Sequence, residues 1–217
     1  MNKYKGVIFD FNGTLFFDND QHIKAWGEIS KIIRGYGMKD EELQHHFNDV
    51  PNKRIIQYLS QNQCDEETIH KYSSLKELYY RMYCQRDIFN FHLVDGIQEY
   101  FDDLNEQNIP FTIVSISIKD NIDFFVGSFH LDRWINREDI IYDNGSYENK
   151  IDMFKKAADV IDVPLSDCLI FEDSLSGIQN AYKAGCHRII VINSADKTDE
   201  YKRLPGVIKV IDNFKEI

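Results

Sequence analysis

Short, continuous apolar runs separated by helical segments are the feature that most constrains the fold of this chain. After residue 96, such runs alternate with segments of helical periodicity to near the end of the sequence. Short continuous runs are typical of strands buried on both faces, and strands interleaved with helices favour βαβ units. The sequence therefore predicts an α/β fold with a mostly parallel sheet. The predicted strands are residues 6–10, 111–115, 140–142, 168–171, 188–192 and 207–211.

The stretch between the first two predicted strands has a different pattern. From residue 18 to residue 89 it carries helical periodicity and no strong strand run. We expect its apolar stripes to be packed faces of helices, and we expect Asn52 to cap one of them. The chain then consists of a core, residues 1–16 and 91–217, and an all-helical insertion, residues 17–90. The stripes are Ala25, Ile29, Ile32 and Ile33; Ile55, Ile56 and Leu59; and Ile69, Tyr72, Leu75, Leu78, Tyr79 and Met82.

Composition argues against several classes of function. The length of 217 residues, with 43% hydrophobic residues, suits one large domain or a core with a modest insertion. The net charge of -11 disfavours a surface for nucleic acid or anionic membrane, because phosphates would be repelled. The 4 cysteines form no CxxC pair, which indicates reduced thiols. With no signal-like start and no long apolar stretch, we expect a cytoplasmic monomer that binds neither nucleic acid nor membrane.

Acidic side chains directly follow two of the predicted strands. The first strand ends in Asp10, shortly before a Gly-Thr turn, and the run 169–171 ends in Glu172 and Asp173. An acid in this position lies at the sheet edge that substrates reach. A carboxylate there can attack phosphorus to form an aspartyl-phosphate, and adjacent carboxylates suit Mg²⁺, which prefers oxygen ligands. The sequence thus predicts Asp10 as a nucleophile and the later pair as ligands of one Mg²⁺.

Two further polar residues are candidates for a phosphate site. Ser115 ends its predicted strand as Asp10 does, so its hydroxyl is placed to donate to a phosphate oxygen. Lys150 begins a helical segment, and its ammonium would neutralise the phosphate and orient Asp10. Each alone is more often an ordinary strand end or a solvated charge, so the prediction depends on their combination with the acids.

Together these residues resemble, in order and approximate spacing, the four motifs of the haloacid dehalogenase (HAD) superfamily. The first motif is Asp10-Phe-Asn-Gly-Thr. Ser115 corresponds to the second motif, Lys150 to the third, and Glu172-Asp173 to part of the fourth. The match runs along essentially the whole chain. Within the superfamily the chain most resembles the β-phosphoglucomutase-like group, on the segments FEDSLSGIQNA at 171–181 and HIKAW at 22–26.

This resemblance implies a Rossmann-like three-layer core with a helical cap inserted after the first motif. It also implies a Mg²⁺-dependent phosphatase that acts on a small phosphorylated metabolite through an aspartyl-phosphate on Asp10. Mg²⁺ would be held by Asp10, the backbone carbonyl of Asn12 and Asp173, with Glu172 in or near the metal shell. The other implied contacts are Ser115, Ile116 and Lys150 to the phosphate, and His22, Lys53 and Arg54 of the cap to the substrate.

Asn12 departs from the family pattern, which has Asp at this position. That Asp protonates the leaving oxygen and then activates water, and such general acid–base help is worth about 10²–10⁴-fold. Asn cannot exchange a proton in this way. The chain is then a slow phosphatase, a phosphate-binding or regulatory protein that kept the site, or a chain in which Asn stands in place of an original Asp. Because Gly13 follows it, Asn12 is also prone to deamidation, which would produce Asp.

Other activities of the superfamily suit this chain less well. A phosphosugar mutase should suffer most from Asn12, because it shuttles a proton between two hydroxyls, and residues 49–54 depart from the mutases' cap-loop pattern. We therefore favour a phosphatase over a mutase. Dehalogenases also lack the second Asp but work without a metal, which fits the later acids poorly. A phosphonate hydrolase needs a cap lysine for a Schiff base, and nothing marks Lys24 or Lys53 as desolvated.

Overall fold

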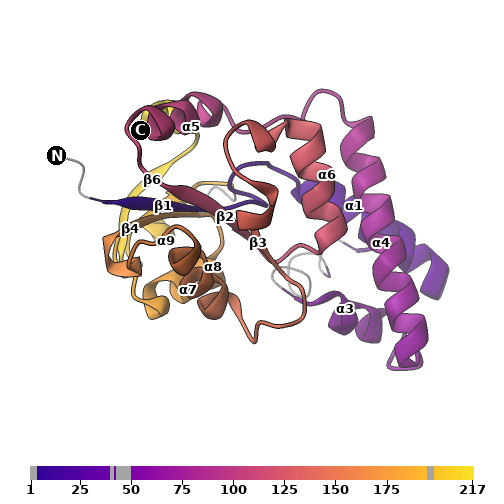
Figure 1. Cartoon of the computed structure of the whole chain (residues 1–217). Coiled ribbons are helices and arrows are strands. Elements are labelled where there is room, and N and C mark those ends of the chain that lie inside the picture. Colours follow the sequence, from indigo (N-terminus) through magenta and orange to yellow (C-terminus); the bar gives the residue numbers. More distant parts are fainter. Residues whose placement is uncertain (1–3, 40–41, 43–49, 195–197) are drawn as a thin grey trace. The chain divides into compact units, whose positions relative to one another are not determined.

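The computed structural model describes residues 4–39, 42, 50–194 and 198–217. The chain divides into two compact units, Met1–Phe17 with His92–Ile217, and Asp18–Phe91. The first unit is an α/β core, and the second is a helical cap inserted after the first strand of the core (Figure 1). The predicted fold class is therefore confirmed.

The described residues of the core form a parallel six-stranded sheet with the strand order β3-β2-β1-β4-β5-β6. β1 and β4 lie at the centre, and every residue of both strands is buried, as their continuous apolar runs predict. Because the strands are parallel, their carboxyl ends lie at one edge of the sheet. The strands are β1 Gly6–Asp10, β2 Phe111–Ser115, β3 Ile141–Tyr142, β4 Cys168–Glu172, β5 Ile189–Ile192 and β6 Val207–Ile211.

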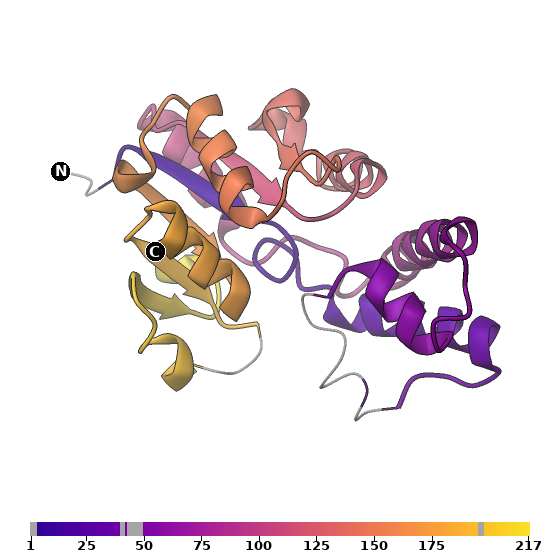
Figure 2. The same ribbon diagram turned by 90° about the horizontal axis from the view of Figure 1, so that it is seen from below.

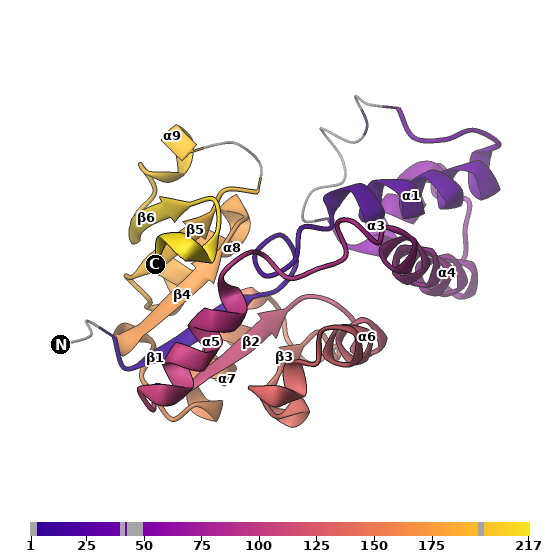
Figure 3. The ribbon, with the colours of Figure 1, turned by 90° about the horizontal axis from the view of Figure 1, so that it is seen from above.

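Helices cover both faces of this sheet, which gives the core three layers. α7 and α8 pack on one face, on a cluster that includes Ile8, Ile170 and Val191, and lie in front of the strands in Figure 2. α5 lies over the other face (Figure 3), where Phe9 stacks on Phe171 with ring centroids 5.0 Å apart. The core helices are α5 Ile97–Glu106, α6 Lys119–Phe129, α7 Lys150–Val160, α8 Leu175–Ala184 and α9 Thr198–Tyr201, with short 3-10 turns η1 Leu131–Arg133, η2 Arg137–Asp139, η3 Leu165–Asp167 and η4 Phe214–Glu216.

The cap consists of α1 Asn19–Arg34, α3 Asn52–Leu59 and α4 Glu66–Arg86 among its described residues. These helices pack around a cluster of their own, with Trp26, Ile29 and Ile56 at its centre. Gly35 ends α1 in a left-handed conformation with φ 84, which a residue without a Cβ adopts at no steric cost. Among the residues described here, no helix is both long and apolar enough to cross a membrane.

The structure corrects three details of the sequence analysis in the cap. Asn52 does not cap α3. Pro51 occupies the cap position, and the Asn52 amide donates to Glu77 Oε1 over 2.7 Å. Ile32 and Leu78, expected on packed faces, are 46% and 55% exposed. α4 instead buries Lys76, Glu77 and Tyr80, so polar partners on other helices decided which face of α4 turns inward.

Candidate active site

Asp10 is the last residue of β1 and is nearly inaccessible, with 5% of its side chain exposed. Its Oδ1 accepts a hydrogen bond from Lys150 Nζ over 2.6 Å. Its Oδ2 is buried and has no hydrogen-bond partner among the described residues. A buried carboxylate oxygen without a partner is costly, so this atom indicates where a ligand belongs.

Lys150 reaches Asp10 from the first turn of α7. Asn149 caps this helix by accepting from Ile151 N over 2.9 Å, which makes Lys150 the first helical residue. Its ammonium donates to Asp10 Oδ1 and to Glu172 Oε1. Burial lowers the pKa of Lys150, but the two carboxylates raise it more, so the pKa lies above its ordinary value and the side chain stays charged.

Glu172 is the last residue of β4, and its side chain is fully buried. Its Oε2 accepts from the backbone N–H groups of Asp173 over 2.8 Å and Ser174 over 2.9 Å, so the carboxylate organises the turn into α8. Gly177 gives it room, because a Cβ at that position would lie 1.8 Å from Glu172 Oε1. Glu172 therefore holds both Lys150 and the turn in place.

Asp173 completes an acidic cluster, defined here as Asp10, Lys150, Glu172 and Asp173. Each of the three carboxylates offers an oxygen, and these oxygens lie within 4.8 Å of one another. Burial, and then the charges of Glu172 and Asp10, raise the pKa of Asp173 well above its ordinary value. Burial likewise raises the pKa of Asp10, with Lys150 opposing it. Such an excess of negative charge around oxygen ligands suits a hard divalent cation.

Asn12 and two serines form a second polar group beside the acids. The hydroxyls of Ser115 and Ser117 donate to Asn12 Oδ1 over 3.0 Å and 2.9 Å. Ser117 N also donates to Ser115 Oγ over 3.1 Å, which closes the turn after β2. Ile116 lies within this turn and is 54% exposed. The structure thus brings Asn12 to the residues predicted to bind phosphate.

The structure brings the core candidates together, and two of the three cap candidates, His22 and Lys53, have partners inside the cap. His22 Nδ1 lies 2.9 Å from Lys76 Nζ, and the His22 ring stacks on Tyr80. Lys53 pairs with Glu66 over 2.6 Å. Arg54 is exposed on the first turn of α3. Of the predicted cap-loop segment, position 49 lies outside the described residues.

Sequence reasoning missed three residues that shape this site. Ser194 Oγ donates to Asp173 Oδ2 over 2.7 Å from just beyond β5, where the strand-end argument used for Asp10 would have found it. Ser117 lies two residues after Ser115, and its hydroxyl meets the same amide oxygen. Gly177 carries no signal of its own, because its importance comes from the carboxylate packed against it.

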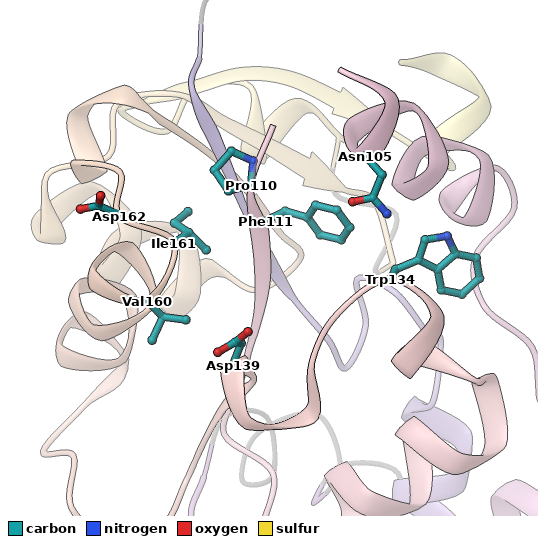
Figure 4. A pocket seen from close by; sticks show the side chains of 8 residues that line it. All are labelled: Asn105, Pro110, Phe111, Trp134, Asp139, Val160, Ile161 and Asp162. Carbon is teal, nitrogen blue, oxygen red and sulfur yellow. The ribbon is translucent and has the colours of Figure 1, made fainter. Parts of the chain in front are cut away.

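A shallow surface pocket lies elsewhere on the core (Figure 4). Its lining includes Pro110 and Phe111, at the start of β2, whereas Ser115 is at the other end of that strand. Trp134 and Ile161 complete much of its wall, and no member of the acidic cluster lines it. The chemistry of the core is therefore concentrated at the carboxyl edge of the sheet, away from this pocket.

The fold and the site together define a class. They describe an α/β protein whose parallel sheet carries three carboxylates and a lysine at one edge, with a helical cap inserted after the first strand. The sequence profile of the haloacid dehalogenase-like hydrolases matches residues 7–191. The chain therefore belongs to the HAD superfamily and is an enzyme, a hydrolase of the phosphatase type.

Individual relatives agree with this assignment. A crystal structure of a HAD hydrolase of family IA, variant 3, from Entamoeba histolytica superposes with a TM-score of 0.91 at 34% identity, covering 98% of this chain and 95% of that one. β-Phosphoglucomutase from Clostridium difficile shares the fold, with a TM-score of 0.77 at 18% identity over 99% and 93% of the two chains. A putative pyrophosphatase, PpaX, from Caldanaerobacter subterraneus is 23% identical over 87% of this chain and 82% of its own length.

Proposed function

We propose that this protein is a Mg²⁺-dependent phosphatase that hydrolyses a small phosphorylated metabolite through an aspartyl-phosphate on Asp10. The observation that carries the proposal is the state of the Asp10 carboxylate. Lys150 holds Oδ1 over 2.6 Å, while the buried Oδ2 has no hydrogen-bond partner among the described residues. A carboxylate oriented through one oxygen leaves the other for a ligand, as a nucleophile requires.

The remaining core residues would bind and orient the phosphoryl group. Ser115, whose hydroxyl lies at the end of β2, and the exposed turn at Ile116 would donate to its oxygens. Lys150 would neutralise the group as Asp10 attacks, since its ammonium is fixed by two carboxylates. Glu172 would act as the positioning residue for Lys150, because its other oxygen is already used by the turn into α8.

The donor set at this edge fits Mg²⁺. Asp10, the backbone carbonyl of Asn12 and Asp173 would hold the ion, with Glu172 in or near its shell. All of these donors are oxygens, and the acidic cluster carries more negative than positive charge. The ion would supply charge neutralisation, so that a carboxylate can approach an anionic phosphate.

The cap would supply the contacts to the rest of the substrate, and His22, Lys53 and Arg54 are its proposed contacts. We place the chain in the β-phosphoglucomutase-like group, which the fold of the Clostridium enzyme supports. Within that group we favour a phosphatase over a mutase, because Asn12 cannot move the proton between two hydroxyls. The relative named a putative pyrophosphatase supports a phosphate-releasing activity.

A phosphate-binding or regulatory protein is the second candidate, and Asn12 is the residue that favours it. Such a protein would keep the phosphate and metal contacts but turn over no substrate. The two functions differ in one measurable quantity, the release of inorganic phosphate. Binding of phosphorylated ligands without release from any of them would support this second candidate.

The experiment is a panel of phosphorylated substrates with Mg²⁺, run on fresh protein checked by mass for deamidation at Asn12. Phosphate release is expected for the wild type, and Asp10→Asn should abolish it. The matched control is Asp132→Asn, because Asp132 is an exposed carboxylate of the core outside the acidic cluster. Release at an undiminished rate by the Asp10→Asn protein would refute the nucleophile assignment.

A further inference from the structure

The Asn12 side chain can form hydrogen bonds, but it cannot transfer a proton. Its Oδ1 accepts hydrogen bonds from the hydroxyls of both Ser115 and Ser117. The other end, Nδ2, carries the amide hydrogens. An amide N–H donates a hydrogen bond without releasing its proton near neutral pH, so Asn12 cannot serve as a general acid or base.

Among the described residues of the core, the side chains that hydrogen-bond to Asn12 do not replace the missing acid. Ser115 and Ser117 are hydroxyls, which are poor proton donors to a departing oxygen near neutral pH. Lys150 is held between Asp10 and Glu172, and its ammonium donates a hydrogen bond to each of these carboxylates. Of the charged groups of the acidic cluster, Lys150 is the one that can pair with a phosphate oxygen, and its ammonium is already engaged by two carboxylates.

We propose that the site acts on phosphoryl groups whose leaving oxygen departs as a stable anion. These are acyl phosphates, phosphoanhydrides, and enol or aryl phosphates, as opposed to phosphate esters of ordinary alcohols. This inference rests on the proposed function and deepens it by naming the substrate class. The juxtaposition of Asn12 with Ser115 and Ser117 carries it, because it places an amide that cannot give up a proton near neutral pH beside the residue proposed to bind phosphate.

The first chemical step then needs no acid. A carboxylate oxygen of Asp10 forms a bond to phosphorus, the bond from phosphorus to the leaving oxygen breaks, and that oxygen keeps the electron pair. With a stable anion the step is complete, whereas an alkoxide needs a proton in the transition state, which is worth about 10²–10⁴-fold.

The second step releases phosphate. Water attacks phosphorus, the bond to Asp10 breaks, the carboxylate is restored, and the water proton passes to the phosphate product or to solvent. With no base at position 12 to assist the water, this step is the slower one for activated substrates. The aspartyl-phosphate should therefore accumulate.

The test is a series of aryl phosphate monoesters of similar shape and different leaving groups, namely 2,4-dinitrophenyl, 4-nitrophenyl and phenyl phosphate. Acetyl phosphate, an acyl phosphate, and glycerol phosphate, an ester of an ordinary alcohol, are measured beside this series. We expect kcat/KM of the wild type with Mg²⁺ to fall steeply along the aryl series. The factor by which Asn12→Asp raises kcat/KM should grow along the same aryl series, by about 10²-fold or more from 2,4-dinitrophenyl to phenyl phosphate. A rapid burst of dinitrophenolate, near one per active site, is expected for the wild type and should shrink in the variant.

The outcomes separate this inference from the proposed function. A wild-type rate that does not depend on the leaving group, or an equal gain from Asn12→Asp on every substrate, would overturn the inference and leave the phosphatase intact. Turnover by the variant alone would overturn it as well. No phosphate release from any substrate by either protein would refute the proposed function itself. Melting temperatures and near-ultraviolet circular dichroism of both proteins establish that the variant is folded.

Discussion

Each unit of the molecule buries a lysine against carboxylates, but the two surroundings differ in their balance of charge. In the core, Lys150 contacts Asp10 and Glu172, with Asp173 beside them. In the cap, Lys76 is only 3% exposed and donates to Glu77 Oε1 over 2.9 Å. The core cluster thus places three carboxylates around one ammonium, whereas Lys76 and Glu77 form a pair.

One group of buried polar side chains in the cap is joined by hydrogen bonds and ion pairs. We define the cap network as Asp18, His22, Asn52, Lys76, Glu77 and Tyr80. Within this network the Asn52 amide donates to the Glu77 carboxylate, and the Tyr80 hydroxyl donates to Asp18. His22 Nδ1 lies within hydrogen-bond distance of Lys76 Nζ. Burial raises the pKa of Glu77, but Lys76 and Asn52 lower it more, so the net pKa lies below its ordinary value.

The acidic cluster of the core shows the opposite behaviour. Burial raises the pKa of Asp10 and Asp173, and the single lysine does not offset it. Both clusters are buried, so burial does not distinguish them. The excess of like charge, and an Asp10 Oδ2 with no hydrogen-bond partner among the described residues, distinguish the core cluster, which could hold a metal ion, from the cap network, where each carboxylate has a hydrogen-bond donor.

The largest effect should come from removing each buried lysine. Lys150→Met should lower the rate of phosphate release by about 10²–10³-fold or more, because it removes the fixed positive charge at the phosphate. Lys76→Met should instead lower stability, by about 3–5 kcal/mol, because Glu77 loses its ion-pair partner in a buried place. Phosphate-release rates and urea unfolding of both proteins measure the two effects.

Matched controls exist on the same helices. Lys155 on α7 is 58% exposed, and Lys71 on α4 is exposed, so Lys155→Met and Lys71→Met should leave both quantities close to wild type. If Lys150→Met changed stability and left the rate of phosphate release unchanged, the proposed difference in function between the acidic cluster and the cap network would be wrong.

Mg²⁺ should reverse the effect that the negative charge of Asp173 has on the stability of the protein. Without the ion, Asp173→Asn should raise stability by about 1 kcal/mol, because a carboxylate with a raised pKa opposes folding when charged. With the ion, the wild type should gain about 2.7 kcal/mol at a concentration 100 times its Kd, and the variant should gain less. Thermal unfolding with and without Mg²⁺ measures both signs.

The control for that experiment is Asp132→Asn, which removes an exposed carboxylate of the core outside the acidic cluster. It should respond to Mg²⁺ as the wild type does. An equal gain from Mg²⁺ in wild type and Asp173→Asn would show that Asp173 holds no ion.

Gly177 tests how tightly the core cluster is packed. A Cβ at this position would overlap Glu172 Oε1, so Gly177→Ala should displace the carboxylate and cost about 1–3 kcal/mol, with a loss of activity. Gly127 on α6 is the control, because nothing lies within 4 Å of a Cβ there. Gly127→Ala should be stabilising by up to about 1 kcal/mol, since Ala favours a helix over Gly. Equal stability of the two variants would contradict the packing argument.

These contrasts explain which features the sequence could predict. The strand-end argument predicted that Asp10 and Glu172 would share one edge of the sheet, and the parallel pairing of β1 with β4 brings them together there. Strand ends are local features, so a single sequence displays them. The cap network was not predicted, because pairs such as Asp18 with Tyr80 join residues on different helices and leave no periodic signal. The apolar stripe of α4 was visible, but the polar partners that turned Leu78 outward were not.

A part-buried ion pair at the far end of α1, Arg34 with Glu42, allows the smallest of the predicted effects to be tested against pH. Arg34 donates to both oxygens of Glu42, over 2.6 Å and 2.7 Å. These hydrogen bonds, with that from the backbone N–H of Lys39, outweigh the effect of burial and lower the pKa of Glu42 to about 2. A lowered pKa means that the charged form stabilises the fold above the ordinary pKa of Glu. That contribution is then lost as the pH falls from about 4.5 towards 2.

Glu42→Gln should therefore lower the stability of the protein at pH 7 by on the order of 1 kcal/mol, and the difference from wild type should shrink as the pH falls through that window. Glu66 provides the contrast, since it pairs with Lys53 but is 76% exposed, and solvent screens such a pair. Glu66→Gln should change stability by less than about 0.5 kcal/mol at either pH. Urea unfolding of the three proteins at pH 7 and near pH 3 measures the effect, and a Glu42→Gln deficit that stayed constant with pH would show that packing, and not charge, is what Glu42 contributes.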